Sequence, residues 1–378
     1  MGDNTLHRED SPQRLAIIQR VLTPYRVPLF DLLSTKYHGG VSVFAGQPAV
    51  GETLTTVDRL NAAELQRTHN RYFFRGMVAS YWQQGLRAWL ERWQPDVLVA
   101  EANPRCLSTR TAIQWMHDRG STVLGWGLGS YSVTPGLAHV RELRRRRFLR
   151  MFDGMLAYSS RAAAQYRDAG FSPNAVFVCN NAATFRPTSF PPQRVPHFSA
   201  APSVLFVGRL TQAKRVDVLI RACALVKEVR PDLAPQLRVV GEGAVRRSLE
   251  ELARRVFPDT TFLGALHGPP LVTEFHSADL FVLPDLGGLA IQEAMSYGLP
   301  VIAGKGDGTQ DDLVRPENGW HVPSPSVTEL ARAMRVALSD AKRLRTMGAA
   351  SFRIVADEIN IDAMAATFVR ATIGVTRG

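Results

Sequence analysis

Two carboxylates flank a glycine turn in the stretch PDLGGLAIQEAMSYGLPVIA, residues 284–303. Asp285 comes directly after an apolar run, Gly287 and Gly288 break the chain, and Glu293 lies eight positions after Asp285. The pattern predicts a strand, a loop that holds Asp285 and a helix that holds Glu293. Two acceptors beside a helix N-terminus suit a ligand with hydroxyl groups next to a phosphate. The alternative is a helix-capping aspartate and a solvated glutamate.

Two cations follow another strand, in VLFVGRLTQAKRVDVL (204–219). The strand ends at Gly208, and Arg209 and Lys214 lie in the loop that leads to the next helix. Both charges together with helix N-terminal amides favour a diphosphate, and the alternative is a pair of solvated loop cations. The turn VVGEG (239–243) lacks the third glycine of the dinucleotide fingerprint, which disfavours NAD binding.

Alternating strands and helices must position these loops. In the first half, strand-like runs occupy 15–18, 41–45, 97–100, 122–125 and 155–157, and helical patterns begin near Tyr25 and cover 80–93 and 107–118. In the second half, strands are expected at 204–207, 237–240, 261–263, 280–283 and 301–303, with helices over 215–229, 245–256, 288–297 and 327–339. Such alternation predicts parallel sheets with crossover helices.

A proline-rich segment without periodicity, 186–203, separates the two halves. The sequence therefore predicts a first domain over 1–185, a linker over 186–203, a second domain over 204–358 and a C-terminal helix over 359–378. Packing of that helix back on the first domain is one option. The fold class is α/β, with two doubly wound Rossmann-like domains that face each other across a cleft, where ligands bind at strand carboxyl ends.

The charge is unevenly distributed. Residues 1–200 hold 24 Arg and Lys against 14 Asp and Glu, whereas residues 201–378 hold 21 against 20. This asymmetry predicts an anionic partner for the first half. The three cysteines lack metal spacing, and we see neither a membrane-spanning run nor a secretory signal, so we expect a cytoplasmic protein.

The ordered motifs GRLTQAK, VVGEG, TFLGAL, PDLGGLAIQEAMSYGLPVI and ENGWHV resemble those of the family 4 retaining glycosyltransferases of the GT-B fold. They cover about 120 residues of the second half, in the family's order and spacing. The opening RLAIIQRVLTPYRVPLF is similar to bacterial members that build cell-surface polysaccharides. The resemblance implies a nucleotide-sugar donor, UDP- or GDP-linked, as a substrate and no further cofactor.

The same resemblance implies roles for residues. Glu293 matches the glutamate that holds the ribose, and Asp285 stands where the family has a glutamate beside the donor sugar. Expected catalytic residues are Asp285, Arg209 and Lys214. Expected donor-binding residues are Gly208, Gly264, Ala265, Gly287, Gly288, Leu289 and Glu293.

No metal site is expected, because we find no Asp-x-Asp motif and the aspartates of GDGTQDD (306–312) lack the spacing of a metal loop. Many family members carry a histidine in the first domain near the reacting carbon. Here the comparable stretch holds Gly127 and Leu128, and His117 and His139 have no motif support, so we name no catalytic base.

An acceptor is expected at the strand ends of the first domain, where we select Arg20, Tyr25, Arg26, Glu101, Asn103 and Arg105. The stretch LAHVRELRRRRFLRMF (137–152) places Arg144, Arg145, Arg146 and Arg147 among apolar residues. This composition suits an anionic membrane surface, and a solvated helix face above core residues is the alternative. Nucleic acid is disfavoured because no binding motif for it is present.

The sequence thus predicts a retaining, metal-independent glycosyltransferase that extends a lipid-linked or polysaccharide acceptor in cell-surface glycan synthesis, peripheral at the inner face of the membrane. Two alternatives stay open: a GT-B nucleotide-sugar epimerase and a non-catalytic sugar-nucleotide-binding assembly protein.

Overall fold

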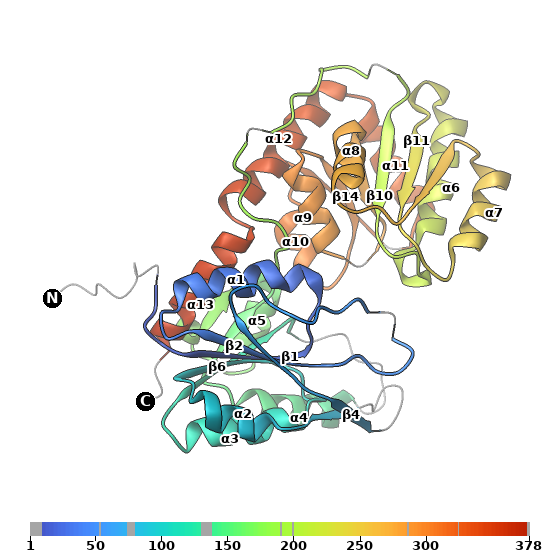
Figure 1. Ribbon diagram of the computed structural model, residues 1–378. Coiled ribbons are helices and arrows are strands. Elements are labelled where there is room, and N and C mark those ends of the chain that lie inside the picture. The colour runs from blue at the N-terminus through green and yellow to red at the C-terminus, as the bar shows by residue number, and fades with distance from the viewer. Residues whose placement is uncertain are drawn as a thin grey trace. The chain divides into compact units, whose positions relative to one another are not determined.

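The computed structural model describes residues 10–52, 54–73, 80–129, 138–189, 191–198, 200–285, 287–323 and 325–375, with the backbone alone at 138–141. The chain divides into two compact units (Figure 1). The first unit combines Met1–Ala183 with Ile361–Gly378, and the second is Thr184–Asn360. Each unit holds a parallel sheet flanked by helices, as the alternating pattern predicts.

The first unit has a seven-stranded parallel sheet in the order β3-β2-β1-β6-β7-β8-β9. The chain runs outward from β1 on one side and then resumes at β6 on the other side of β1. The strands are β1 (Leu15–Val21), β2 (Val41–Gly46), β3 (Glu64–Arg67), β6 (Val97–Glu101), β7 (Thr122–Gly127), β8 (Gly154–Ala157) and β9 (Val176–Val178).

Both faces of this sheet are covered, so its strands are apolar on both sides. Leu15 and Ile17 of β1 pack into the same core as α1 and α13, whereas Ala16 and Ile18 pack with α2, α3 and α5. Figure 1 shows α1 and α13 on one side of β1 and β6, with α2 and α3 on the other. The helices are α1 (Val27–Lys36), α2 (Leu86–Trp93), α3 (Ser108–His117), α4 (Ala138–Leu149), α5 (Ser160–Asp168) and α13 (Ile361–Gly374).

A separate antiparallel pair, β4 (Asn70–Phe73) and β5 (Ser80–Gln83), belongs to the first unit. The expectation of a helix over 80–93 was wrong for its first residues, because 80–83 form β5 and the helix begins only at Leu86. Gly85 between them has φ of 73°, a left-handed conformation that glycine adopts at little cost and that separates strand from helix.

The second unit has a six-stranded parallel sheet in the order β12-β11-β10-β13-β14-β15. Its strands are β10 (Ser203–Val207), β11 (Gln236–Val240), β12 (Thr260–Gly264), β13 (Leu280–Leu283), β14 (Val301–Gly304) and β15 (Gly319–Val322). Its helices are α6 (Val216–Val229), α7 (Arg246–Val256), α8 (Pro269–Ser277), α9 (Leu289–Ser296), α10 (Thr309–Leu313), α11 (Val327–Leu338) and α12 (Ala341–Asp357). Ser326 and Asp340 cap α11 and α12 by accepting backbone N–H bonds from Glu329 and Arg343.

The proline-rich segment expected as a linker belongs to the second unit. Arg194 ties it down by donating to the carbonyl oxygens of Phe275, at 2.8 Å, and of His276, at 2.9 Å. The Arg345 guanidinium donates to the carbonyl oxygen of Val195 at 3.0 Å. These contacts join positions 80 to 150 residues apart, so local sequence patterns do not reveal them.

The C-terminal helix α13 belongs to the first unit, although the whole second unit precedes it in the chain. Phe368 on this helix is fully buried, and its ring lies 5.0 Å from that of Trp126 in an edge-to-face contact. Tyr37 and Thr372 share a buried hydroxyl hydrogen bond of 2.8 Å. The last turns of the chain therefore complete the core of the first unit.

We expect Phe368→Ala to destabilise the first unit by about 3–5 kcal/mol, because the ring leaves a cavity beside Trp126. Urea unfolding followed by tryptophan fluorescence measures this, since five of the six tryptophans lie in the first unit. Val336→Ala, at an exposed position of α11 in the second unit, is the control and should change stability by less than about 0.5 kcal/mol. An unchanged midpoint for Phe368→Ala would mean that α13 does not support this core.

Candidate functional site

In the second unit, the order in which strands are added to the sheet reverses between β10 and β13. From β10 the chain runs to β11 and β12 on one side, and it then resumes at β13 on the other side of β10. At such a switch point the loops after the two central strands diverge, which leaves a crevice for a ligand at the carboxyl edge. The loop from Gly208 to Lys214 follows β10, and the loop from Asp285 to Gly288 follows β13.

Glycines let neighbouring loops approach closely at this edge. A Cβ atom on Gly241 would lie 1.9 Å from the carbonyl oxygen of Gly208, and one on Gly243 would lie 2.1 Å from that of Leu210. The backbone N–H of Leu210 donates to the carbonyl oxygen of Glu242 at 2.8 Å. The Gly-x-Gly turn after β11 thus supports the loop after β10, and this packing explains why the turn needs both glycines.

Lys214 lies half-buried among the charged residues of this edge. A Cβ atom on Gly287, whose φ is 149°, would lie only 2.9 Å from the Lys214 ammonium nitrogen. Burial, followed by the charge of Arg209, lowers the pKa of Lys214, whereas the charges of Asp285 and Asp307 act in the opposite direction. The structure therefore brings Arg209, Lys214, Asp285 and Gly287 together at one edge of the sheet.

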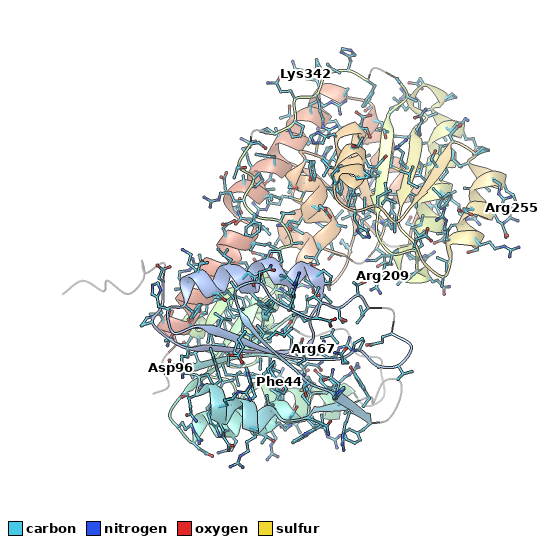
Figure 2. All side chains as sticks on the ribbon, viewed as in Figure 1. Phe44, Arg67, Asp96, Arg209, Arg255 and Lys342 are labelled. Atoms are coloured by element: carbon cyan, nitrogen blue, oxygen red, sulfur yellow. The ribbon has the colours of Figure 1, made fainter. Side chains whose placement is uncertain are left out.

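This part of the edge is suited to an anion. Arg209 is exposed and extends from the loop after β10 at the end of the sheet (Figure 2). Gly288 occupies the N-cap of α9 and has no side chain to accept from the first amides of that helix, which begins at Leu289. Two cations and the positive end of a helix dipole are the groups that bind phosphates in proteins.

Asp285 is held close to the end of the neighbouring strand. A Cβ atom on Gly304 would lie 2.0 Å from the carbonyl oxygen of Pro284 and 3.1 Å from the Cα atom of Asp285. From this position the Asp285 carboxylate acts electrostatically on both Lys214 and Arg215. The carboxylate therefore lies within the cationic cluster at the carboxyl edge of the sheet.

Glu293 lies on α9, half-buried. Burial raises the pKa of its carboxyl group, and the charge of His267 acts in the opposite direction. His267 belongs to the loop after β12, which begins with the predicted Ala265; the predicted Gly264 is the last residue of β12 and has φ of 74°. The third loop of the candidate site thus reaches Glu293 through His267, a residue that sequence reasoning missed.

Asp307 is the second residue that sequence reasoning missed, because we examined it only as a metal ligand. Its Oδ1 accepts from the backbone N–H of Thr309 at 3.0 Å and from the Thr309 hydroxyl at 2.6 Å. The Thr309 hydroxyl oxygen would lie 3.0 Å from a Cβ atom on Gly288. The loop after β14 therefore borders the glycine turn before α9, and strand order in a parallel sheet was the signal that could have shown this.

The first unit carries a second set of polar residues at the carboxyl edge of its own sheet, where β1 and β6 are neighbours. The backbone N–H of Arg20 donates to Glu101 Oε1 at 2.9 Å, and the Arg20 side chain donates to Glu52 at 2.7 Å and to the Tyr72 hydroxyl at 3.2 Å. Burial raises the pKa of Glu101, while the hydrogen bond and the charges of Arg20 and Arg26 oppose that shift.

Arg26 differs from the other residues selected for the acceptor, because only 3% of it is exposed. Its guanidinium lies 4.2 Å from the centre of the Trp126 ring and 5.0 Å from that of Tyr25, and it donates to the Tyr158 hydroxyl at 2.9 Å. Arg26 therefore acts on Glu101 as a buried charge. Nearby, Asn103 accepts the backbone N–H of Arg105 at 3.1 Å, and Arg105 is exposed.

Two histidines of the first unit, His117 and His139, were considered in the sequence as possible bases. His117 Nε2 lies 3.2 Å from Asp153 at the end of α3, opposite to the carboxyl edge of the sheet. The side chain of His139 lies outside the described residues.

The arginine-rich helix α4 combines core and surface residues. Phe148 and Leu149 are buried, as is Phe152 after the helix, so these apolar residues serve the core. Arg145 and Arg146 pair with Glu142 at 2.8 and 2.9 Å and lower the pKa of its carboxyl group to about 2. Arg144 and Arg147 are exposed.

We expect Glu293→Gln to raise the melting temperature at pH 7. Because burial raises the folded-state pKa of Glu293, the folded state binds its proton more tightly than the unfolded state, and the ionised carboxylate costs stability at neutral pH. The advantage of Gln should shrink as the pH falls through the raised pKa of Glu293 and should be gone below the ordinary pKa of glutamate, about 4.3. Thermal melts at pH 7 and pH 4 measure the difference, with Glu228→Gln, at an exposed position of α6, as the control. A lower melting temperature for Glu293→Gln at pH 7 would contradict the expectation.

Comparison with known sequences assigns a family to the second unit. Residues 191–353 match the family described as Glycosyl transferases group 1. The chain is 31% identical over 156 residues to D-inositol 3-phosphate glycosyltransferase of Stackebrandtia nassauensis. This match covers 38% of this chain and 35% of the relative. It is 34% identical over 156 residues to GDP-mannose-dependent alpha-mannosyltransferase of Corynebacterium glutamicum. This match covers 40% of this chain and 35% of the relative. The chain thus spans about a third of the length of these relatives.

Solved structures extend the likeness to nearly the whole chain. Sucrose-phosphate synthase from Thermosynechococcus elongatus superposes with a TM-score of 0.70 at 21% identity, over 93% of this chain and 96% of that one. Anabaena HepE, solved in complex with UDP, gives a TM-score of 0.68 at 14% identity, over 93% and 97%. At these identities the likeness establishes the fold. Residues 191–353 of the second unit therefore match a glycosyl transferases group 1 domain, and the chain has the GT-B fold with two Rossmann-like domains.

Proposed function

We propose that the protein is a retaining glycosyltransferase that moves a sugar from a nucleotide-sugar donor to a lipid-linked or polysaccharide acceptor in cell-surface glycan synthesis. The observation that carries the proposal is the position of Lys214 beside Arg209 and Gly287, at the switch point of a sheet that belongs to a glycosyl transferases group 1 domain.

The second unit holds the donor in this proposal. Lys214, Arg209 and the amides at Gly288 and Leu289 bind the diphosphate, and the Glu293 carboxylate accepts hydrogen bonds from the ribose. The loop at Gly264 and Ala265 contacts the base. A UDP- or GDP-linked sugar is supported by the UDP found with Anabaena HepE and by the GDP-mannose dependence named for the Corynebacterium relative.

The proposed reaction uses no metal ion and no protein nucleophile. The bond between the sugar anomeric carbon and the diphosphate oxygen breaks, and negative charge develops on the leaving diphosphate. Lys214, Arg209 and the helix amides stabilise that charge. The acceptor oxygen bonds to the same face of the anomeric carbon and passes its proton to the departing phosphate oxygen. Asp285, at the rim of the cationic cluster, contacts the transferred sugar.

The first unit holds the acceptor in this proposal. Arg20, Tyr25 and Glu101 offer one cation, one phenol and one half-buried carboxylate at the carboxyl edge of its sheet, and Asn103 and Arg105 follow β6. Arg26 contributes from the interior through its charge on Glu101. Such a mixed set suits a sugar acceptor that also carries an anionic group.

Incubation with labelled UDP- and GDP-sugars and a lipid extract separates this proposal from its alternatives. Transfer of label to lipid supports the transferase. Epimerisation of free donor without transfer would replace it with the nucleotide-sugar epimerase, and binding without turnover would replace it with the assembly protein. A donor screen by thermal shift identifies the nucleotide first, because a ligand that binds only the folded state raises the melting temperature.

We expect Lys214→Ala to lower kcat by about 10²–10³-fold with a smaller change in KM, because its charge acts most strongly on the developing diphosphate. Glu293→Ala should instead weaken nucleotide binding, which thermal shift with the identified nucleotide measures. Lys227→Ala, at an exposed position of α6 where Lys227 pairs with Asp259, is the control. Unchanged kinetics and binding in both site variants would refute the site assignment.

We also propose that the protein binds peripherally to the inner face of the membrane through Arg144–Arg147. Within the part of the chain that the structure describes, no helix is long and apolar enough to cross a bilayer. The support for surface contact is the exposure of Arg144 and Arg147 and the basic excess of the first 200 residues.

We expect the protein to sediment with vesicles rich in anionic lipid at low salt, and replacement of Arg144–Arg147 by serine should weaken this binding. Each basic residue near the headgroups contributes about 1 kcal/mol, and the contribution is screened by salt. Cosedimentation at rising salt concentration tests this, with Arg247→Ser, at an exposed position of α7, as the control. Low-salt binding that does not change in the serine variant would reject the role of the arginine cluster.

A further inference from the structure

We infer that a pocket between α2 and α3 of the first unit holds an acyl chain of an anionic phospholipid and thereby anchors the protein in the bilayer surface. This inference rests on the proposed membrane contact and adds a second element to it, an apolar one. The pocket lies wholly within the first unit, and none of its lining residues is among those selected for the acceptor.

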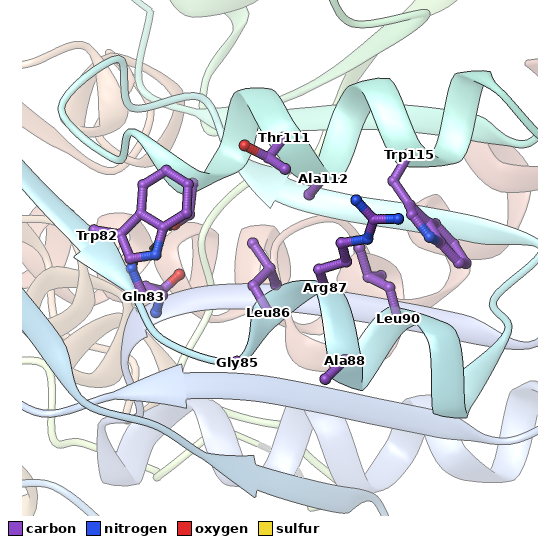
Figure 3. A pocket seen from close by; sticks show the side chains of 11 residues that line it. Trp82, Gln83, Gly85, Leu86, Arg87, Ala88, Leu90, Thr111, Ala112 and Trp115 are labelled. Carbon is purple, nitrogen blue, oxygen red and sulfur yellow. Dashed lines mark hydrogen bonds between the residues drawn. The ribbon is translucent and has the colours of Figure 1, made fainter.

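The pocket has a volume of about 130 Å³ and is lined mainly by apolar atoms of α2, α3 and β5. Figure 3 shows Trp82 at one end, Trp115 at the other, Leu86 and Leu90 along α2, and Ala112 on α3. A dry apolar cavity of similar size, about 150 Å³, holds one small hydrocarbon. The lining therefore suits the end of an alkyl chain and offers few of the polar groups that a sugar or a nucleotide needs.

The mouth of the pocket is exposed, and the charged residue that lines it, Arg87, is in an ion pair with Glu91. Arg87, Ala88 and Thr111 line the pocket and are exposed to solvent. The Arg87 side chain pairs with Glu91 at 2.8 Å and lies beside Trp115 in Figure 3. Because this ion pair is exposed, an anionic head group can exchange with the Glu91 carboxylate at the Arg87 guanidinium while an apolar chain enters the pocket.

Apolar side chains that face solvent lie next to this pocket. In the β4–β5 pair, Arg71 and Trp82 are register partners, and Phe73 shares their outward face, whereas Tyr81 is buried on the inner face. Phe73 is 43% exposed, and Trp82 and Leu107 are each 38% exposed. The backbone N–H of Leu107 donates to the carbonyl oxygen of Tyr81, which places Leu107 beside β5.

Aromatic residues with neighbouring arginines are the composition of a protein surface at the level of lipid headgroups. Isolated exposed apolar residues need no explanation, but this group borders an open apolar pocket. Phe73, Trp82 and Leu107 can therefore enter the interface while the pocket takes one chain from the bilayer.

The helix that carries the arginine cluster, α4, is a neighbour of α3, which lines the pocket. The Arg110 guanidinium of α3 lies 5.0 Å from the centre of the Phe148 ring of α4, so these helices are neighbours, and the exposed Arg144 and Arg147 lie on α4. The Arg119 guanidinium stacks on Trp115 at 3.8 Å. Positive charge on the pocket side favours an anionic lipid and opposes pairing with a second copy of the same basic face.

Vesicles of phosphatidylglycerol and phosphatidylcholine, with and without bromine on the acyl chains, test the inference with the full chain. Bromine quenches tryptophan fluorescence only at short range, so brominated vesicles should quench the wild type, and Trp82→Phe should remove much of that quenching. Thr111→Glu places a carboxylate at the pocket and should lower the binding that persists at high salt by about tenfold. Gln114→Glu adds the same charge to an exposed position of α3 that does not line the pocket, and it should leave this binding near that of the wild type.

Each result decides the inference. It is overturned if brominated chains do not quench, if Thr111→Glu and Gln114→Glu have equal effects, or if the wild type forms a dimer in sedimentation velocity that Thr111→Glu dissociates. If binding is lost only in the Arg144–Arg147 serine variant, and only at low salt, the membrane contact is electrostatic and the pocket plays no part in it. Thermal shift with the identified nucleotide should be the same in all pocket variants, so a failure of the proposed donor site is detected separately.

Discussion

Lys214 is half-buried, and its position is set by the strand order and the glycine-rich loops of the second unit. A Cβ atom on Gly287 would lie 2.9 Å from the Lys214 ammonium nitrogen, and the loops after β10 and β13 meet because these two strands are neighbouring parallel strands. Gly241, Gly243 and Gly304 then allow the surrounding loops to pack within contact distance of one another. A charge that is costly to bury is thereby held where an anionic ligand can compensate it.

Both units place polar residues at the point where the strand order of the sheet reverses. In each sheet the chain first runs outward on one side of a central strand and then resumes on the other side. The loops at the switch hold cations and acids in both units, but one cation of the first unit, Arg26, is buried under aromatic rings, whereas Arg20 and Arg105 reach the surface. The charge of the buried Arg26 acts on the Glu101 carboxylate from within the first unit.

Strand ends could be predicted from the sequence because apolar runs terminate at glycine, proline or aspartate, as at Gly208 and Asp285. The start of α2 could not, because Trp82, Leu86 and Leu90 have helical spacing, and only the left-handed Gly85 separates the strand from the helix. His267 and Asp307 join the site through strand order, which no local pattern encodes. The contacts of Arg194 with distant carbonyl groups could not be predicted either. Every residue has a backbone carbonyl oxygen, so the sequence does not indicate which of them the Arg194 guanidinium will meet.

The position of α13 has a consequence for the order in which the protein can fold on the ribosome. Thr184–Asn360 is one uninterrupted stretch, so the second unit can reach its native structure as soon as that stretch has emerged. The first unit is synthesised earlier, yet its core waits for Phe368 to cover Trp126. The first unit of a nascent chain would therefore stay incompletely folded for most of translation. Its apolar core surface would be available to chaperones until α13 has been synthesised.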